Sequence, residues 1–143
     1  MNRLALALLL IASPAAAHDA RASETFTFTT TQGPIAAQSS TARDAKGMSF
    51  TTDLEYGDGH RERAAGECSV RTIPPGDEYS QTGVCVAPGA YTLAFHCAAP
   101  GKAGANCWGE LTGAIEGHHN GLTGLVTFRN TPEGIAGVGR WND

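Results

Sequence analysis

Hydrophobic and polar side chains alternate along much of the chain with the two-residue period of β-strands. The clearest case is the segment 47–56, in which Met48, Phe50, Leu54 and Tyr56 lie on one face and polar side chains on the other. After the first 17 residues no segment keeps a helical period over ten residues. Turns rich in Gly and Pro divide the pattern into about eight strands. These are expected over residues 24–31, 47–56, 61–73, 79–86, 91–98 and 134–141, with two more forming a hairpin within 107–129.

The hairpin within 107–129 contains the strongest turn signal of the chain. Asn120-Gly121 lies between two alternating runs, and an Asn-Gly pair favours a two-residue type I′ turn, because both central residues need a positive φ. With that turn Phe128 lies opposite Gly113 and covers it. The apolar residues of the hairpin then share one face: Leu111, Ile115, Val126 and Phe128.

Short connections between the strands make neighbouring strands antiparallel. A meander of about eight strands protects its edges most economically by closing into a barrel. Glycines recur between residues 109 and 139 and suit the strong coiling of a small barrel. The small and polar stretch 32–44 is expected to be a loop. The sequence therefore predicts an all-β fold, a small antiparallel β-barrel of about eight strands, with a β-sandwich as the alternative.

The N-terminus has the pattern of a secretory leader. Arg3 precedes an apolar run over 4–12, and an Ala-x-Ala site ends at Ala17. The apolar run is too short to span a bilayer, which requires about 20 residues. We expect a cleaved signal peptide over residues 1–17, a single β domain over residues 18–143, a periplasmic or secreted location and no membrane span.

The charge balance is mildly acidic, with 10 Lys and Arg residues against 14 Asp and Glu residues and a net charge of −4. Loss of Arg3 with the leader would make it −5. A balance of this sign argues against nucleic acid and anionic membranes as partners. The acidic stretch 53–62 does not fit the ligand spacing of a calcium loop and is expected to be a solvated hairpin tip.

The four cysteines lie in the part of the chain that would be exported. An even number of cysteines in an exported protein predicts disulfides, and the Cys-x-x-Cys spacing of many metal sites is absent. Three connectivities are open. The pairs Cys68–Cys85 and Cys97–Cys107 are favoured, because each pair brackets one predicted loop.

Histidines are the candidate metal ligands. Cleavage of the leader would make His18 the first residue, so that its α-amine and imidazole could bind copper together with His96, His118 or His119. On a strand Glu116 and His118 would share a face, and with His119 they form a second candidate set for Cu or Zn. The alternative is that the histidine pair is solvated beside a turn and that His96 is a structural histidine.

The run Gly117-His118-His119-Asn120-Gly121-Leu122-Thr123-Gly124 resembles the G-x-[FY]-x-G-x-x-G stretch of the allene oxide cyclase-like and dirigent-like proteins. The resemblance implies an eight-stranded antiparallel barrel whose mouth holds an apolar small molecule. In that family the tight turn precedes the motif, which would place both histidines on a strand. His119 replaces the usual aromatic residue, and the resemblance assigns no catalytic residue to this chain.

Candidate residues for binding an apolar ligand are the aromatic residues of the predicted interior and rim, namely Phe50, Phe95, Trp108 and Phe128. The chain contains no Gly-x-Ser-x-Gly nucleophile elbow. Glu110 and Glu116 would suit acid–base chemistry only if they lined a lumen. We expect a non-enzymatic protein that binds a small apolar molecule or serves as a structural interaction module. A metal-binding protein that uses His18 and a cyclase- or isomerase-like barrel enzyme are the alternatives.

Overall fold

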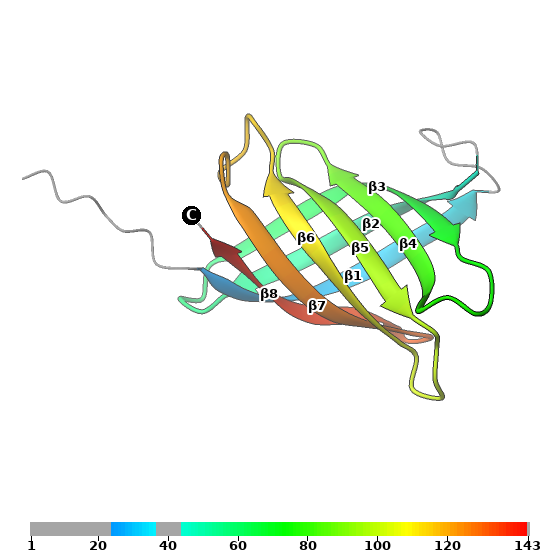
Figure 1. The fold of residues 1–143 in the computed structure, drawn as a ribbon. Coiled ribbons are helices and arrows are strands. Elements are labelled where there is room, and N and C mark those ends of the chain that lie inside the picture. The colour runs from blue at the N-terminus through cyan, green and yellow to red at the C-terminus, as the bar shows by residue number, and fades with distance from the viewer. Residues whose placement is uncertain (1–23, 37–43, 143) are drawn as a thin grey trace, which may run out of the picture.

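The computed structural model describes residues 24–36 and 44–142, which form eight antiparallel strands closed into a barrel (Figure 1). The strands are β1 (Thr25–Ala36), β2 (Lys46–Tyr56), β3 (Arg61–Thr72), β4 (Tyr79–Ala87), β5 (Tyr91–Ala98), β6 (Ala105–Gly113), β7 (Thr123–Thr131) and β8 (Gly134–Asn142). Each strand pairs with the next one in the sequence, and β8 pairs with β1 to close the barrel. The predicted all-β barrel is confirmed, and the sandwich is wrong.

The described residues contain no helix, and accordingly none that is long and apolar enough to cross a bilayer. The leader predicted over residues 1–17 and His18 lie outside the described residues. One predicted loop is shorter than expected, because β1 continues through the stretch 32–36. A bulge shifts its register against β2 there, so that Ile35 pairs with Met48.

The connection between β6 and β7 differs from the predicted two-residue hairpin. The strands separate after Gly113, whose N–H donates to the Leu122 carbonyl at 3.0 Å, and residues 114–122 form a loop. Gly121 does adopt the positive φ of 80° that the Asn-Gly pair favours. Phe128 lies opposite Cys107 instead of Gly113, a shift of six residues. Because the shift is even, Phe128 keeps the inward orientation that alternation predicted.

This loop folds back onto the end of the barrel. A Cβ on Gly113 would lie 1.8 Å from the His119 carbonyl oxygen, so only glycine permits the contact. His119 is buried by it, while Ile115 leaves the sheet and is 84% exposed. Ile115 was expected on the apolar face of the hairpin, and that prediction is wrong because its position belongs to the loop.

Aromatic rings fill space that glycines leave on the inner face of β8. A Cβ on Gly137 would lie 2.6 Å from the Cβ atom of Phe128, and one on Gly139 would lie 2.4 Å from the ring of Phe26. Side chains at these two positions would displace the rings. The glycine-rich strand thus lets large residues from neighbouring strands pack across a narrow barrel.

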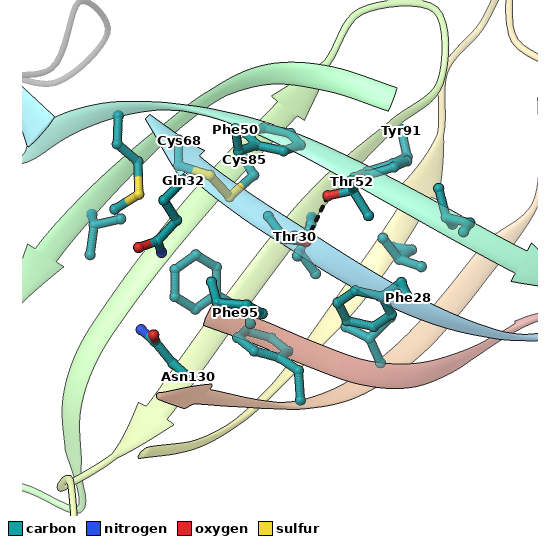
Figure 2. A pocket seen from close by; sticks show the side chains of 18 of the residues that line it. Phe28, Thr30, Gln32, Phe50, Thr52, Cys68, Cys85, Tyr91, Phe95 and Asn130 are labelled. Atoms are coloured by element: carbon teal, nitrogen blue, oxygen red, sulfur yellow. Dashed lines mark hydrogen bonds between the residues drawn. A yellow bond between two sulfur atoms is a disulfide. The ribbon is translucent and has the colours of Figure 1, made fainter. Parts of the chain in front are cut away.

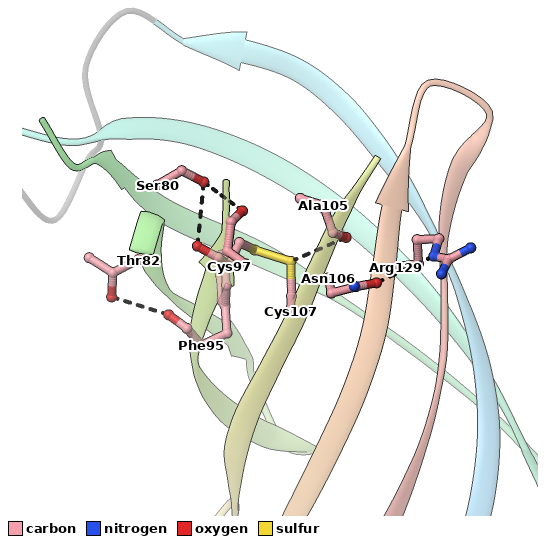
Figure 3. Close-up of a disulfide and its surroundings, with 9 residues drawn as sticks. Ser80, Thr82, Phe95, Cys97, Ala105, Asn106, Cys107 and Arg129 are labelled. Carbon is pink, nitrogen blue, oxygen red and sulfur yellow. Dashed lines mark hydrogen bonds between the residues drawn. A yellow bond between two sulfur atoms is a disulfide. The ribbon is translucent and has the colours of Figure 1, made fainter. Parts of the chain in front are cut away.

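Two disulfides connect adjacent strands inside the barrel. Cys68–Cys85 joins β3 to β4, and Cys97–Cys107 joins β5 to β6, which confirms the favoured connectivity. Figure 3 shows the second disulfide beside Ser80, whose hydroxyl donates to the Ala98 carbonyl at 2.8 Å and more weakly to the Cys97 carbonyl at 3.4 Å. Covalent and hydrogen-bonded links therefore hold β4, β5 and β6 together at the same end of the barrel.

Candidate functional site

The interior of the barrel contains a cavity of about 180 Å³ to which all eight strands contribute. Its wall is mainly aromatic and aliphatic, and Figure 2 shows the rings of Phe28, Phe50 and Phe95 around it. None of the described residues that line the cavity is Asp, Glu, Lys, Arg or His. An apolar concave space with a few polar groups is the usual form of a small-molecule site.

The cavity reaches the surface at one end, which we call the mouth. The mouth is the end at which β1 ends and β2 begins, together with the connections β3–β4, β5–β6 and β7–β8. Ile35 belongs to the cavity wall and is 63% exposed in the described part of the chain. The described residues therefore leave this end of the cavity in contact with solvent.

The opposite end, which we call the closed end, is filled by side chains. Trp141 is 1% exposed, and its indole stacks on the His119 ring with centroids 4.4 Å apart and an interplanar angle of 15°. His119 reaches this position from the β6–β7 loop, and Tyr56 lies against it from the end of β2. The loop therefore closes the barrel through one inserted imidazole.

Polar side chains at the closed end form a connected network. His119 Nε2 lies 2.9 Å from the Tyr56 hydroxyl, and this hydroxyl donates to Glu62 Oε2 at 3.1 Å. With the hydroxyl proton directed to Glu62, His119 Nε2–H is the donor to Tyr56. His60 Nε2 lies 3.3 Å from the other carboxylate oxygen of Glu62. The buried imidazole is thus connected through Tyr56 and Glu62 to the surface.

Burial and charge shift two pKa values in this network. Burial is the main reason that the pKa of Tyr56 is raised well above its usual value, and the charge of Glu62 adds to the rise. The nearby Trp141 indole N–H lowers the pKa of Tyr56 and so offsets part of this rise. The indole N–H forms no hydrogen bond of normal geometry with any described residue. Partial burial raises the pKa of Glu62, but the charge of His119 and hydrogen bonds to the carboxylate outweigh it and leave that pKa below its usual value.

Glu62 is the member of this network that the sequence did not reveal. It belongs to the acidic stretch that was expected to be a solvated hairpin tip, and its side chain is only 28% exposed. A signal was present, because Glu62 shares the alternation phase of Ala64 and Cys68, which face inward. Its partner His119 is 57 residues away in the sequence, and no local pattern connects the two.

The structure places three of the four candidate ligand-binding residues in the cavity wall, namely Phe50, Phe95 and Phe128. The fourth, Trp108, lies on the outer face of the barrel and is 38% exposed. Its neighbours Cys107 and Gly109 are buried, so strand alternation turns the indole outward. There it packs edge-on against Tyr79, with centroids 5.2 Å apart. Trp108 therefore does not line the cavity.

Within residues 24–36 and 44–142 the candidate metal ligands are divided between the outer face of β5 and the β6–β7 loop, where the rings of His118 and His119 lie edge to face with centroids 5.1 Å apart. His96 lies on the outer face of β5 beside Tyr79, and its ring does not enter the cavity. Glu116 and His118 lie exposed in the β6–β7 loop, so the prediction that they share a strand face is wrong. His119 turns inward, away from solvent. The described residues contain no group of three His, Cys, Asp or Glu side chains that could hold a metal ion.

The candidate acid–base pair is also outside the cavity. Glu110 lies exposed on the outer face of β6, and Glu116 lies exposed in the loop at the closed end. The cavity wall offers only uncharged groups to a bound molecule.

Comparison of the chain with protein-family models, with curated proteins and with solved structures finds no match. The fold and the cavity define the class of protein. It is a small, disulfide-linked antiparallel β-barrel that is filled at one end and has an apolar cavity toward the other.

Proposed function

We propose that this protein binds a small apolar molecule in the barrel cavity and does so without catalysing a reaction. The observation that supports this most directly is the apolar cavity of about 180 Å³ with an exposed mouth. An apolar cavity of about 150 Å³ accommodates benzene. A ligand with one ring or a short aliphatic chain is therefore the right size.

The expected affinity is modest. Burial of apolar surface contributes about 25 cal/mol per Å², so a ligand that buries about 250 Å² gains roughly 6 kcal/mol. That gain corresponds to a dissociation constant of roughly tens of micromolar. The cost of association is not yet subtracted from this free energy. Such an affinity suits reversible carriage or sensing of a molecule that is abundant in its surroundings.

The proposal includes export of the protein to the periplasm or the extracellular medium. Two disulfides in a chain of this size are compatible with an oxidising compartment. The leader pattern over residues 1–17 supports the same location. A binder of small molecules would meet its ligand there directly.

Toluene titration followed by calorimetry tests the binding function. Val70 lines the cavity, so Val70→Phe should fill part of it and weaken toluene binding at least tenfold. Val84 lies on the outer face of β4 and is 45% exposed, so Val84→Phe is the matched control and should bind like the wild type. Absence of toluene binding to the wild type, or equal binding by both variants, would contradict the proposal.

A further inference from the structure

The polar side chains of the cavity wall fall into two sets that differ in depth. The deep set is Thr30, Thr52 and Tyr91. The second set lies toward the mouth and consists of three carboxamides from three different strands, which we call the mouth amides: Gln32 of β1, Gln81 of β4 and Asn130 of β7.

The deep set is already satisfied by hydrogen bonds within the protein. The Thr30 and Thr52 hydroxyls lie 2.8 Å apart, as the dashed line in Figure 2 marks. Burial raises the pKa of the Tyr91 hydroxyl, and its hydrogen bond with Thr52 offsets part of that rise. Because these hydroxyls have partners, an apolar ligand can pass over them without leaving a buried polar group unpaired.

The mouth amides have no side-chain hydrogen-bond partner among the described residues. Figure 2 shows the carboxamides of Gln32 and Asn130 directed toward one another across the cavity. Both side chains retain contact with solvent. A carboxamide both donates and accepts hydrogen bonds, so the mouth amides can bind a hydroxyl, a carbonyl or an amide group.

We infer that the cavity selects neutral amphipathic molecules, with an apolar body in the lumen and one uncharged hydrogen-bonding head group held by the mouth amides, over the ionised acids of the same skeleton. This inference rests on the proposed function and specifies its ligand class. An ionised carboxylate in an apolar cavity needs a cation beside it to offset desolvation. None of the described lining residues supplies one, whereas a hydroxyl needs only the hydrogen bonds that the amides offer.

The described cations near the mouth do not change this conclusion. Arg71 is paired with Asp44 outside the cavity. Lys102 is exposed in the β5–β6 connection and is not part of the cavity wall. Lys46 shares the alternation phase of the lining residue Met48, but it is exposed and is not part of the cavity wall. If Lys46 did draw anionic ligands to the mouth, carboxylates would bind better than alcohols, and Lys46→Gln would reverse that order.

Three probes with the same ring separate head-group selection from apolar binding: toluene, benzyl alcohol and benzoate, titrated by calorimetry at pH 7.5. Benzyl alcohol should bind at least tenfold more tightly than benzoate. Gln32→Leu combined with Asn130→Leu should weaken benzyl alcohol about tenfold and leave toluene within about twofold, because only the alcohol uses the amides. Asn106→Leu, on the outer face of β6, is the control and should change neither probe.

The outcomes distinguish the two proposals. If toluene binds but benzoate equals or exceeds benzyl alcohol, the head-group inference is overturned and the binding function stands. If the double variant weakens toluene and benzyl alcohol equally, the amides act on the shape of the mouth and the inference is again overturned. If no probe binds the wild type, both proposals fail. Thermal unfolding of each variant shows whether the barrel is intact, and Asn130→Leu alone repeats the test if the double variant unfolds.

Discussion

The two ends of this barrel use aromatic side chains in opposite ways. At the closed end Trp141 and Tyr56 pack against His119 and fill the interior. Toward the mouth the rings of Phe50 and Phe95 surround an unfilled cavity. The strands are continuous from one end to the other, so the difference arises from the connections. The β6–β7 loop inserts a side chain into the barrel.

Polar groups differ between the two ends in the same way. At the closed end the buried imidazole of His119 has partners in Tyr56 and Glu62. The hydrogen bonds among His119, Tyr56 and Glu62 favour one packing arrangement, because any other leaves one of these three side chains unpaired. At the mouth the amides of Gln32 and Asn130 have no side-chain hydrogen-bond partner within residues 24–36 and 44–142. Stability should therefore depend mainly on the closed end and binding on the mouth.

Trp141→Ala is expected to have the largest effect on stability. Removing a fully buried tryptophan costs about 3–5 kcal/mol in the free energy of unfolding, and the variant also removes the surface on which His119 stacks. Trp108→Ala is the matched control on the outer face and should cost about 1 kcal/mol or less. Urea denaturation with the disulfides intact measures both. Equal losses would show that the closed end is no more tightly packed than the surface.

Removal of either disulfide should lower the free energy of unfolding by about 3 kcal/mol. The two disulfides close loops of 17 and 10 residues in the unfolded chain. The two pairs should differ in binding. Cys68 and Cys85 line the cavity, so changing both to Ala enlarges it and alters toluene affinity. Cys97 and Cys107 do not line it, and their double Ala variant should bind toluene like the wild type. The same change of affinity in both variants would contradict this assignment.

Alternation predicted the strands and their inner faces well. The inward residues of β2 include those that the two-residue period selected, and the favoured cysteine pairs join adjacent strands. The pairing of β6 with β7 was wrong by six residues. The local preference of Asn120-Gly121 for a turn was real, but a contact between Gly113 and the β6–β7 loop decided where the strands separate.

The two candidate sites were predictable to different degrees. Phe50 and Phe95 were expected inside the barrel, and periodicity sufficed for that. The cavity itself was not predictable, because it is the space left after rings from all the strands have packed past the glycines of β8. The closed-end network was missed because Glu62 and His119 meet only when the barrel closes. Local patterns contain no information about such distant pairs.

His119→Phe tests the network separately from the stacking. Phenylalanine can keep the ring contact with Trp141 but leaves Tyr56 and Glu62 without the imidazole. Loss of a buried hydrogen-bond partner should cost about 1–3 kcal/mol. His118→Phe is the neighbouring control, and this exposed position should show little change. A double-mutant cycle with Tyr56→Phe should reveal coupling, and independent effects would mean that the 2.9 Å contact contributes nothing.

The acid dependence of stability should show a smaller contribution from Glu62. Its pKa is lower in the folded protein than the ordinary value of 4.5, despite partial burial, because of the charge of His119 and hydrogen bonds from His60 and Tyr56. The folded state therefore binds the proton less tightly than the unfolded state, and the ionised carboxylate stabilises the barrel above pH 4.5. This stabilisation is lost as the pH falls through the folded-state pKa. Urea denaturation should show that the stability lost in Glu62→Gln becomes smaller toward pH 3. The loss should also be smaller in the His119→Phe background. A loss that is constant from pH 7 to pH 3 would assign to Glu62 a role in packing alone.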